Sequence, residues 1–218
     1  HLSYSQKFRA PKYQKAKEGT ISMKKHDYSI IDNTFVYGLD ESIVASGYPM
    51  SDKLNPCHLE TRRPTNGDMK RAMRLGNAPA GSGHDCYLKG IIVQFDLTLT
   101  KQAWPEAQRY HFLDFVSSMS AMHMLAKMDV RFISYTDRRI ADMFLDIVRD
   151  YNQNPTEENW RHMIYSYPSG LLLTARMTTN YLQLKNIYAQ RKAHRLPEWK
   201  VICDWIASLP KAKELGVV

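Results

Sequence analysis

The stretch YLKGIIVQFDLTLT, residues 87–100, contains the clearest strand signal in the chain. Two sets of residues alternate along it. The apolar set is Ile91, Val93, Phe95, Leu97 and Leu99, and the more polar set is Ile92, Gln94, Asp96 and Thr98. Alternation with a period of two predicts a β-strand, and the apolar set predicts that one face of this strand is buried. A sheet is therefore expected, and the remaining elements are assigned around it.

The segments before this strand predict a strand, two short helices and loops. In residues 28–50, β-branched and aromatic residues predict a strand, followed by a turn and a short helix. Residues 66–77, NGDMKRAMRLGN, predict a basic helix with Asp68 near its start. Residues 55–66 and 78–84 have the composition of loops.

The segments after the strand predict mostly helices. Residues 105–128 predict a long helix, because Pro and Glu at its start suit a first turn, and residues 129–136 predict a strand. The later elements are an amphipathic helix over 137–153, a shorter helix over 155–167, and a strand followed by one or two helices, broken near Pro197, over 169–209. Strands and helices alternate without a glycine-rich phosphate loop, which favours an α+β fold over a doubly wound one.

The length and charge distribution predict one domain with a basic arm. A chain of 218 residues with 44% hydrophobic residues can bury one substantial core, which we expect over residues 26–218. Residues 1–25 contain seven Lys or Arg and one acid, and they predict an arm. The arm is a solubilising tail, or it docks onto a neighbouring subunit or onto nucleic acid. No apolar run reaches the roughly 20 residues that span a bilayer, so we expect a soluble, cytoplasmic protein.

The net charge of +8 and the pI near 9.3 predict an anionic partner: a nucleotide, a nucleic acid or a phosphate-bearing substrate. Three widely separated cysteines predict free thiols in a reducing compartment. Zinc is an alternative, because Cys57 adjoins His58 and Cys86 lies two residues from His84. The chain has no Cys-x-x-Cys or His-Glu-x-x-His spacing, so we expect no metal site.

A band of uncharged amides marks the segment TTNYLQLKNIYAQRKAHRLPEW, residues 178–199. On a helix, one stripe holds Asn180, Leu184, Ile187 and Arg191, and three amides adjoin it: Gln183, Asn186 and Gln190. Amides match the edges of heterocyclic rings, and an arginine fork suits a phosphate or a pair of carbonyls. The band therefore suits a nucleotide or a flavin. The alternative is a helix packed against polar protein groups, with its amides paired to backbone.

The same segment resembles the C-terminal flavin and substrate helix of the flavin-dependent thymidylate synthases. In that family a Pro is followed by Asn, Asn and Arg at intervals of twelve, six and five residues, and Pro168, Asn180, Asn186 and Arg191 keep these intervals. The resemblance implies that Asn180 and Asn186 contact FAD and that Arg191 holds the pyrimidine. The family has a further flavin-contacting Arg where this chain has Leu182.

Two upstream segments extend the resemblance. GSGHDCYLKG is similar to the family's Gly-His-x-Ser/Thr-x-x-Glu-His segment, which implies a cofactor-binding role for His84, although Lys and Gly replace the Glu-His pair. The family's Arg-His-Arg signature corresponds to residues 110–112, YHF, and its serine to Ser120. The resemblance implies that His111 binds the cofactor and that Ser120 and His123 bind the substrate. An ungapped alignment from the strand places Arg109 in the first signature position instead.

The resemblance spans about residues 28–205 and implies a thymidylate synthase-like mixed sheet with long helices in a homotetramer. In the family, reduced FAD relays a one-carbon group from methylene-tetrahydrofolate to dUMP, and reduced nicotinamide is a further co-substrate. It implies an enzyme that acts on dUMP or a related pyrimidine nucleotide, with Arg191 and Ser120 as catalytic residues. Basic residues near the matched segments that can replace the missing signature arginines are Arg109, His123, Lys89, Arg161 and Arg176.

Two other functions stay open. The missing signature arginines fit a family member without catalysis that binds a nucleotide or a nucleic acid. A structural or assembly role that uses the fold as a scaffold is the third. Bound flavin separates the enzyme from these functions. The position of Arg191 tests nucleotide binding itself: an Arg191 that faces open water, or that pairs with a carboxylate away from any cleft, contradicts it.

Overall fold

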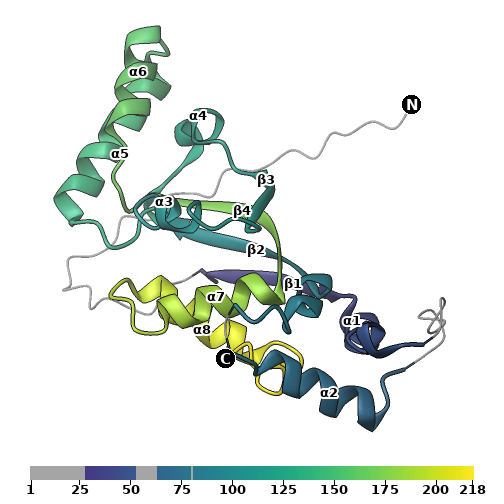
Figure 1. Cartoon of the computed structure of the whole chain (residues 1–218). Coiled ribbons are helices and arrows are strands. Elements are labelled where there is room, and N and C mark those ends of the chain that lie inside the picture. The colour runs from purple at the N-terminus through teal and green to yellow at the C-terminus, as the bar shows by residue number, and fades with distance from the viewer. Residues whose placement is uncertain (1–27, 53–62, 80) are drawn as a thin grey trace, which may run out of the picture.

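The computed structural model describes residues 28–52, 63–79 and 81–218, and Figure 1 shows how their elements are arranged. Four strands form one sheet in the order β1-β2-β4-β3. Their bounds are β1 Ile31–Tyr37, β2 Ile92–Thr100, β3 Asp114–Ser118 and β4 Leu172–Asn180. The predicted α+β class is confirmed, but the three pairings are all antiparallel, so the sheet is not mixed.

Helices precede, separate and follow the strands along the chain. The α-helices of the described residues are α1 Leu39–Ala45, α2 Asn66–Gly76, α3 Trp104–Ala107, α4 Ala121–Met124, α5 Arg138–Gln153, α6 Glu157–Ser166, α7 Tyr181–Arg191 and α8 Pro197–Ser208. Short 3-10 helices lie at Tyr48–Met50, Cys86–Gly90, Leu125–Lys127 and Val130–Phe132. The predicted break near Pro197 is where α8 begins, since a proline suits the first turn of a helix.

The strand β2 has the predicted pattern of burial. Its apolar set lies in the main core, with each side chain at most 2% exposed, whereas Gln94, Asp96 and Thr98 on the other face are partly exposed. Leu184 of α7 and Ile206 of α8 belong to the same core cluster, and Figure 1 shows both helices on one side of the sheet. The sheet thus forms one layer, and α7 and α8 form a second layer packed on it. This packing fixes the position of α7.

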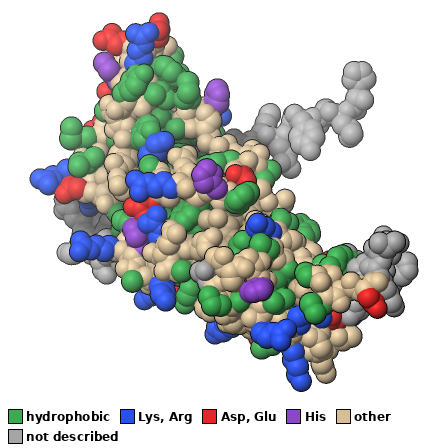
Figure 2. Space-filling view, in the orientation of Figure 1, with side chains coloured by type: hydrophobic (Ala, Val, Ile, Leu, Met, Phe, Trp, Pro, Cys, Tyr) green, Lys and Arg blue, Asp and Glu red, His purple; other side chains and the backbone are tan. Residues whose placement is uncertain are grey.

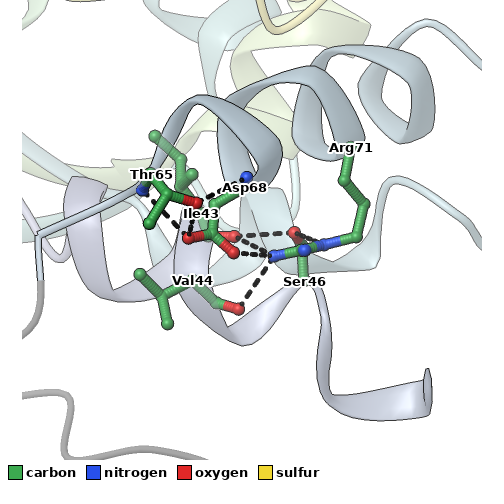
Figure 3. A network of polar contacts seen from close by, with 6 residues as sticks. All are labelled: Ile43, Val44, Ser46, Thr65, Asp68 and Arg71. Carbon is green, nitrogen blue, oxygen red and sulfur yellow. Dashed lines mark hydrogen bonds and ion pairs between the residues drawn. The ribbon is translucent and has the colours of Figure 1, made fainter. Parts of the chain in front are cut away.

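A polar network joins α2 to the end of α1, as Figure 3 shows. The Thr65 hydroxyl accepts from the backbone N–H of Asp68, and the Asp68 carboxylate accepts from the backbone N–H of Thr65 at 2.9 Å. This reciprocal cap explains why the helix begins where Asp68 predicts. Arg71 then donates to Asp68 at 2.6 Å and to the carbonyl of Val44 at 3.3 Å, so the same carboxylate fixes α2 against α1.

Two predictions around the middle of the chain are wrong. Residues 105–128 do not form one long helix: α3 ends at Ala107, and β3 follows as the outer strand of the sheet, paired with β4. Hydrogen bonds to a strand about sixty residues away override the local helix pattern here. Residues 129–136 are not a strand, because Val130–Phe132 is a 3-10 helix and Ile133 makes only an isolated bridge to Leu171.

The helices α5 and α6 confirm the two helices predicted over 137–153 and 155–167. Figure 1 shows them as a pair that projects from one end of the sheet. Phe144 of α5 and Met163 of α6 are buried in a second apolar cluster with Leu125 and Leu171. This second cluster anchors the pair to the end of β4.

Some predictions lie outside the described residues. These are the basic arm over residues 1–25, most of the loop over 55–66, and the Cys57–His58 pair. Among the helices that the structure describes, none has the length and apolar character needed to cross a membrane.

Candidate functional site

The predicted amide band lines a cleft of about 390 Å³. Two segments that are far apart in the sequence form its walls: the turn between α3 and β3, and the outward face of α7. The lining residues are Arg109, Tyr110, His111, Gln183, Asn186, Gln190 and Arg191. Four of the residues predicted from the resemblance are therefore brought together here: Arg109, His111, Asn186 and Arg191.

Arg191 is held from behind while one edge of its guanidinium stays free. Its Nε donates to the Tyr110 hydroxyl at 2.7 Å, and its Nη1 donates to Glu106 Oε2 at 2.8 Å. The guanidinium carbon lies 4.5 Å from the centre of the Trp199 ring, which adds a cation–π contact. Nη2 has no hydrogen-bond partner among the described residues. Arg191 thus has a fixed orientation and unused donors at the cleft.

Glu106 is a functional candidate that the sequence did not indicate. Its Oε2 accepts from Trp199 Nε1 at 2.9 Å as well as from Arg191, and His194 Nε2 lies 3.2 Å from the same oxygen. In the sequence, Glu106 reads only as an acid in the first turn of a helix. The carboxylate compensates part of the charge of Arg191, and it does so beside the cleft, not away from one.

Gln183 places an unpaired amide in the cleft wall. The residue is only 9% exposed, yet its side chain has no hydrogen-bond partner among the described residues. The amide is not among the fully buried polar groups without a partner, so its atoms are open to water or to a ligand in the cleft. Gln190, at the opposite end of the band, accepts from the Tyr110 hydroxyl through Oε1 at 3.1 Å.

Asn180 lies at the start of α7, outside the cleft. Its Oδ1 accepts from the backbone N–H of Gln183 at 2.9 Å, so the side chain caps the helix. Asn180 is therefore the cap and not a helical member of the predicted stripe, because Tyr181 is the first helical residue. The role of Asn180 toward FAD stays a prediction that rests on the family resemblance.

Ser120 and His123 are separate from the cleft in one chain. Ser120 is the N-terminal cap residue of α4 and makes no capping bond with its side chain, and His123 is exposed on that helix. Neither lines the cleft. Their contacts with substrate stay predictions from the resemblance.

His84 lies in a second hollow, of about 640 Å³. Its lining residues are Ala45, Ser46, Tyr48, Pro49, Met50, Arg71, Arg74, Leu75, Gly83, His84, Cys86 and Tyr87. Burial, with a further contribution from Asp85, raises the pKa of Tyr87, so this phenol stays protonated and donates to the carbonyl of Ala72 at 2.8 Å. The hollow combines aromatic and apolar walls with cationic side chains.

The other basic residues named as replacements are not at the cleft. Arg176 pairs with Asp96 at 3.2 Å on the open face of the sheet, and Arg161 pairs with Glu157 on α6. Lys89 is exposed near the start of β2. Of the five residues, only Arg109 lines the cleft. Within the described residues, no group of three or more His, Cys, Asp or Glu side chains is placed to hold a metal ion.

No family model matches the chain, and no curated protein matches its sequence. Solved structures do match its fold. Two structures of the flavin-dependent thymidylate synthase ThyX from Helicobacter pylori with FAD and dUMP have TM-scores of 0.64 and 0.65 at 15% and 16% identity. The two matches cover 87% and 86% of this chain, and 98% and 96% of the two ThyX chains.

A third solved structure is the UMP/dUMP methylase PolB from Streptomyces cacaoi, bound with 5-Br dUMP. It has a TM-score of 0.57 at 11% identity. The match covers 85% of this chain and 94% of the PolB chain. At these identities the similarity shows the fold alone. The chain has the fold of the flavin-dependent thymidylate synthases, as the sequence resemblance predicts.

Proposed function

We propose that the chain is a flavin-dependent thymidylate synthase-like enzyme that transfers a one-carbon group to a pyrimidine deoxynucleotide, dUMP or a related nucleotide. The observation that carries the proposal is the cleft in which an oriented Arg191 adjoins the unpaired amide of Gln183. Both groups offer hydrogen bonds to the carbonyl edge of a pyrimidine. The structures with this fold that contain dUMP support the same ligand.

Each wall of the cleft supplies one requirement of the reaction. The free donors of Arg191 stabilise negative charge that develops on a pyrimidine carbonyl when carbon 5 of the ring reacts. Arg109, exposed on the opposite wall, offers a cationic contact for the nucleotide phosphate. His111, exposed beside it, offers the cofactor contact that the resemblance implies. Glu106 and Tyr110 hold Arg191 in place, so its orientation costs little when the nucleotide binds.

The second hollow fits part of a flavin cofactor. Its volume lies within the range of roughly 300–1,000 Å³ that is usual for cofactor sites. Tyr48 and Tyr87 offer aromatic surface to a ring, and Arg74 and His84 offer polar contacts to phosphates. FAD, when bound, would supply electrons for reduction of the transferred one-carbon unit. Reduced nicotinamide and methylene-tetrahydrofolate are the co-substrates that this chemistry would use.

The proposed homotetramer completes the site. Ser120, His123 and Asn180 lie outside the cleft of their own chain, and a neighbouring subunit is the means by which they would reach a bound nucleotide or FAD. The active site would then lie between subunits. Ser120 would serve as a catalytic residue and His123 as a substrate contact.

A second candidate is a nucleotide-binding protein without catalysis. The ion pair between Arg191 and Glu106 favours it, because the carboxylate weakens the positive field that acts on the ring. Nucleic-acid binding has less support. Figure 2 shows Lys and Arg side chains spread over several elements of the face in view instead of forming one stripe, and the basic arm lies outside the described residues.

The test is made on the purified full chain. We expect an absorbance band at about 450 nm that stays with the protein after free flavin is removed, either as purified or after reconstitution with FAD. We also expect dUMP to be converted to a methylated product when reduced nicotinamide and methylene-tetrahydrofolate are supplied. Chromatography of the nucleotides measures this conversion. A chain that binds dUMP but neither binds FAD nor forms product supports the second candidate. A chain that binds no pyrimidine nucleotide contradicts both.

A further inference from the structure

Tyr110 connects Arg191 to Gln190 by two hydrogen bonds through one hydroxyl group. Arg191 Nε lies 2.7 Å from the hydroxyl oxygen, and this oxygen lies 3.1 Å from Gln190 Oε1. All three residues line the cleft. The guanidinium of Arg191 is also 5.4 Å from the centre of the Tyr110 ring, so the phenol is fixed by its ring as well as by its oxygen.

The direction of this relay is set by chemistry. An arginine Nε can only donate, so the Tyr110 oxygen accepts from Arg191 and keeps its own proton for Gln190. That proton requires an acceptor, and Oε1 is the acceptor of the Gln190 amide. With its oxygen occupied, Gln190 has only its Nε2 group left for the cleft. Gln190 is therefore a donor there, although a glutamine can usually present either group.

Two sets of donors thus face the same ligand space: Nη2 of Arg191 and Nε2 of Gln190, neither of which is bonded within the described part of the chain. Two donors pair with two ring carbonyls. A uracil ring has carbonyl oxygens at positions 2 and 4, whereas cytosine has an amino group at position 4. A cytosine would set that amino group against an N–H donor, and such unpaired polar groups are costly in a site.

We infer that Gln190, oriented by Tyr110, is a specificity-determining residue that selects a 4-oxo over a 4-amino pyrimidine nucleotide. This inference rests on the proposed function, because it assigns a ring preference to the same cleft. Gln183 and Asn186 do not set the preference, since neither amide is fixed by a side-chain hydrogen bond and each can turn to suit either ring.

The test compares the dissociation constants of dUMP and dCMP by titration calorimetry on the full chain and its variants. The wild type should bind dUMP at least about tenfold more tightly than dCMP. Gln190→Glu replaces the donor by an acceptor and should invert the order of the two ligands. Tyr110→Phe releases the Gln190 amide, and the ratio should fall to within about threefold of one. Tyr188→Phe, which removes a hydroxyl that has no partner in the described residues, should keep the wild-type ratio.

The ratio of the two constants separates this inference from the proposed function. The added negative charge of Gln190→Glu weakens the binding of both phosphorylated ligands alike. The charge alone therefore leaves the ratio unchanged, and any change in the ratio comes from the exchange of a donor for an acceptor. Equal binding of dUMP and dCMP by the wild type, or a ratio unaltered in Gln190→Glu, overturns the inference and leaves the function standing. Failure of the wild type to bind either nucleotide overturns the function. Gln190 is exposed on α7, so we expect Gln190→Glu to fold as the wild type does. This variant therefore tests the inference even if Tyr110→Phe lowers the melting temperature.

Discussion

Lys185 and Asp85 form an ion pair that joins the walls of the two hollows. Lys185 Nζ lies 2.8 Å from Asp85 Oδ2 and donates to the carbonyl of Gly76 at 2.7 Å. Lys185 lies on α7 among the cleft residues, and Asp85 lies directly between His84 and Cys86 of the second hollow. The ion pair therefore links α7, which carries the proposed nucleotide wall, to the segment that carries the proposed flavin wall.

The ion pair leads to a prediction on stability. The side chains of Lys185 and Asp85 are only 18% and 11% exposed, so removal of one partner leaves a buried charge uncompensated. We expect Lys185→Met to lower the free energy of unfolding by about 3 kcal/mol, measured by urea denaturation. Lys192→Met, at the exposed end of the same helix, is the matched control. A loss in Lys185→Met no larger than that of the control would show that the pair is not formed in solution.

A second prediction separates the charge of Arg191 from its shape. Arg191→Lys keeps a cation beside Glu106 but loses the planar fork and the Nε bond to Tyr110. We expect the affinity for dUMP to fall by roughly 1.5–3 kcal/mol, or about ten- to a hundredfold, whereas the free energy of unfolding changes by about 1 kcal/mol or less. Calorimetric titration and urea denaturation measure the two quantities.

The conservative variant is needed because Arg191→Ala would leave Glu106 and its hydrogen bonds without their cation. Its effect on stability would obscure its effect on binding. Arg195→Lys, at an exposed position beyond the end of α7, is the matched control and should bind dUMP as the wild type does. Unchanged dUMP affinity in Arg191→Lys would exclude the guanidinium as a ring contact.

The parts of the fold that the sequence predicts well depend on local patterns. The alternation around Phe95 marks β2, and the cap formed by Asp68 marks the start of α2. The failure over residues 105–128 has a different origin: β3 exists because its backbone pairs with β4 far along the chain, and all its side chains are exposed. A strand without a buried face leaves no alternation of apolar and polar residues to read.

The candidate site divides in the same way. The amides beside Arg191 are visible in the sequence, because a helical period collects them on one side. Glu106 and Tyr110 are not, because they meet Arg191 only through the packing of α3 against α7 and α8. The polarity of Gln190 depends in turn on that contact. Donor and acceptor assignments are tertiary information even where the residue types are evident.

Two phenols, one partly and one fully buried, predict a loss of stability at alkaline pH. Burial raises the pKa of Tyr87 and of Tyr181 in the folded chain above the ordinary value of 10.0, and in each a nearby carboxylate raises it further. Between that value and the folded pKa, the unfolded chain loses protons that the folded chain keeps. The unfolded state is then favoured as the pH rises. The contribution to stability is thus complete below about pH 10 and is lost above it.

The measurement is the free energy of unfolding between about pH 8 and pH 11. Above about pH 10 the stability should fall by up to 1.4 kcal/mol per pH unit for each tyrosine. The double variant Tyr87→Phe/Tyr181→Phe should have a shallower slope in this window, although it is less stable at neutral pH because two hydrogen bonds to carbonyls are lost. An identical alkaline slope in both proteins would contradict this account.

The last prediction compares two glycines of one helix, Gly67 and Gly76 of α2. A Cβ at Gly76 would lie 2.2 Å from the carbonyl oxygen of Leu215, which is backbone and cannot turn away, and the Gly76 carbonyl also holds Lys185. At Gly67 the nearest atom would be the Thr65 hydroxyl oxygen, at an ordinary 3.6 Å. We expect Gly76→Ala to lower the free energy of unfolding by about 2 kcal/mol or more and Gly67→Ala to raise it by about 0.5–1 kcal/mol. Alanine favours the helix at both positions, so changes of opposite sign in the free energy of unfolding would isolate the contact with the C-terminal segment. Changes of the same sign would mean that this segment is not packed on α2.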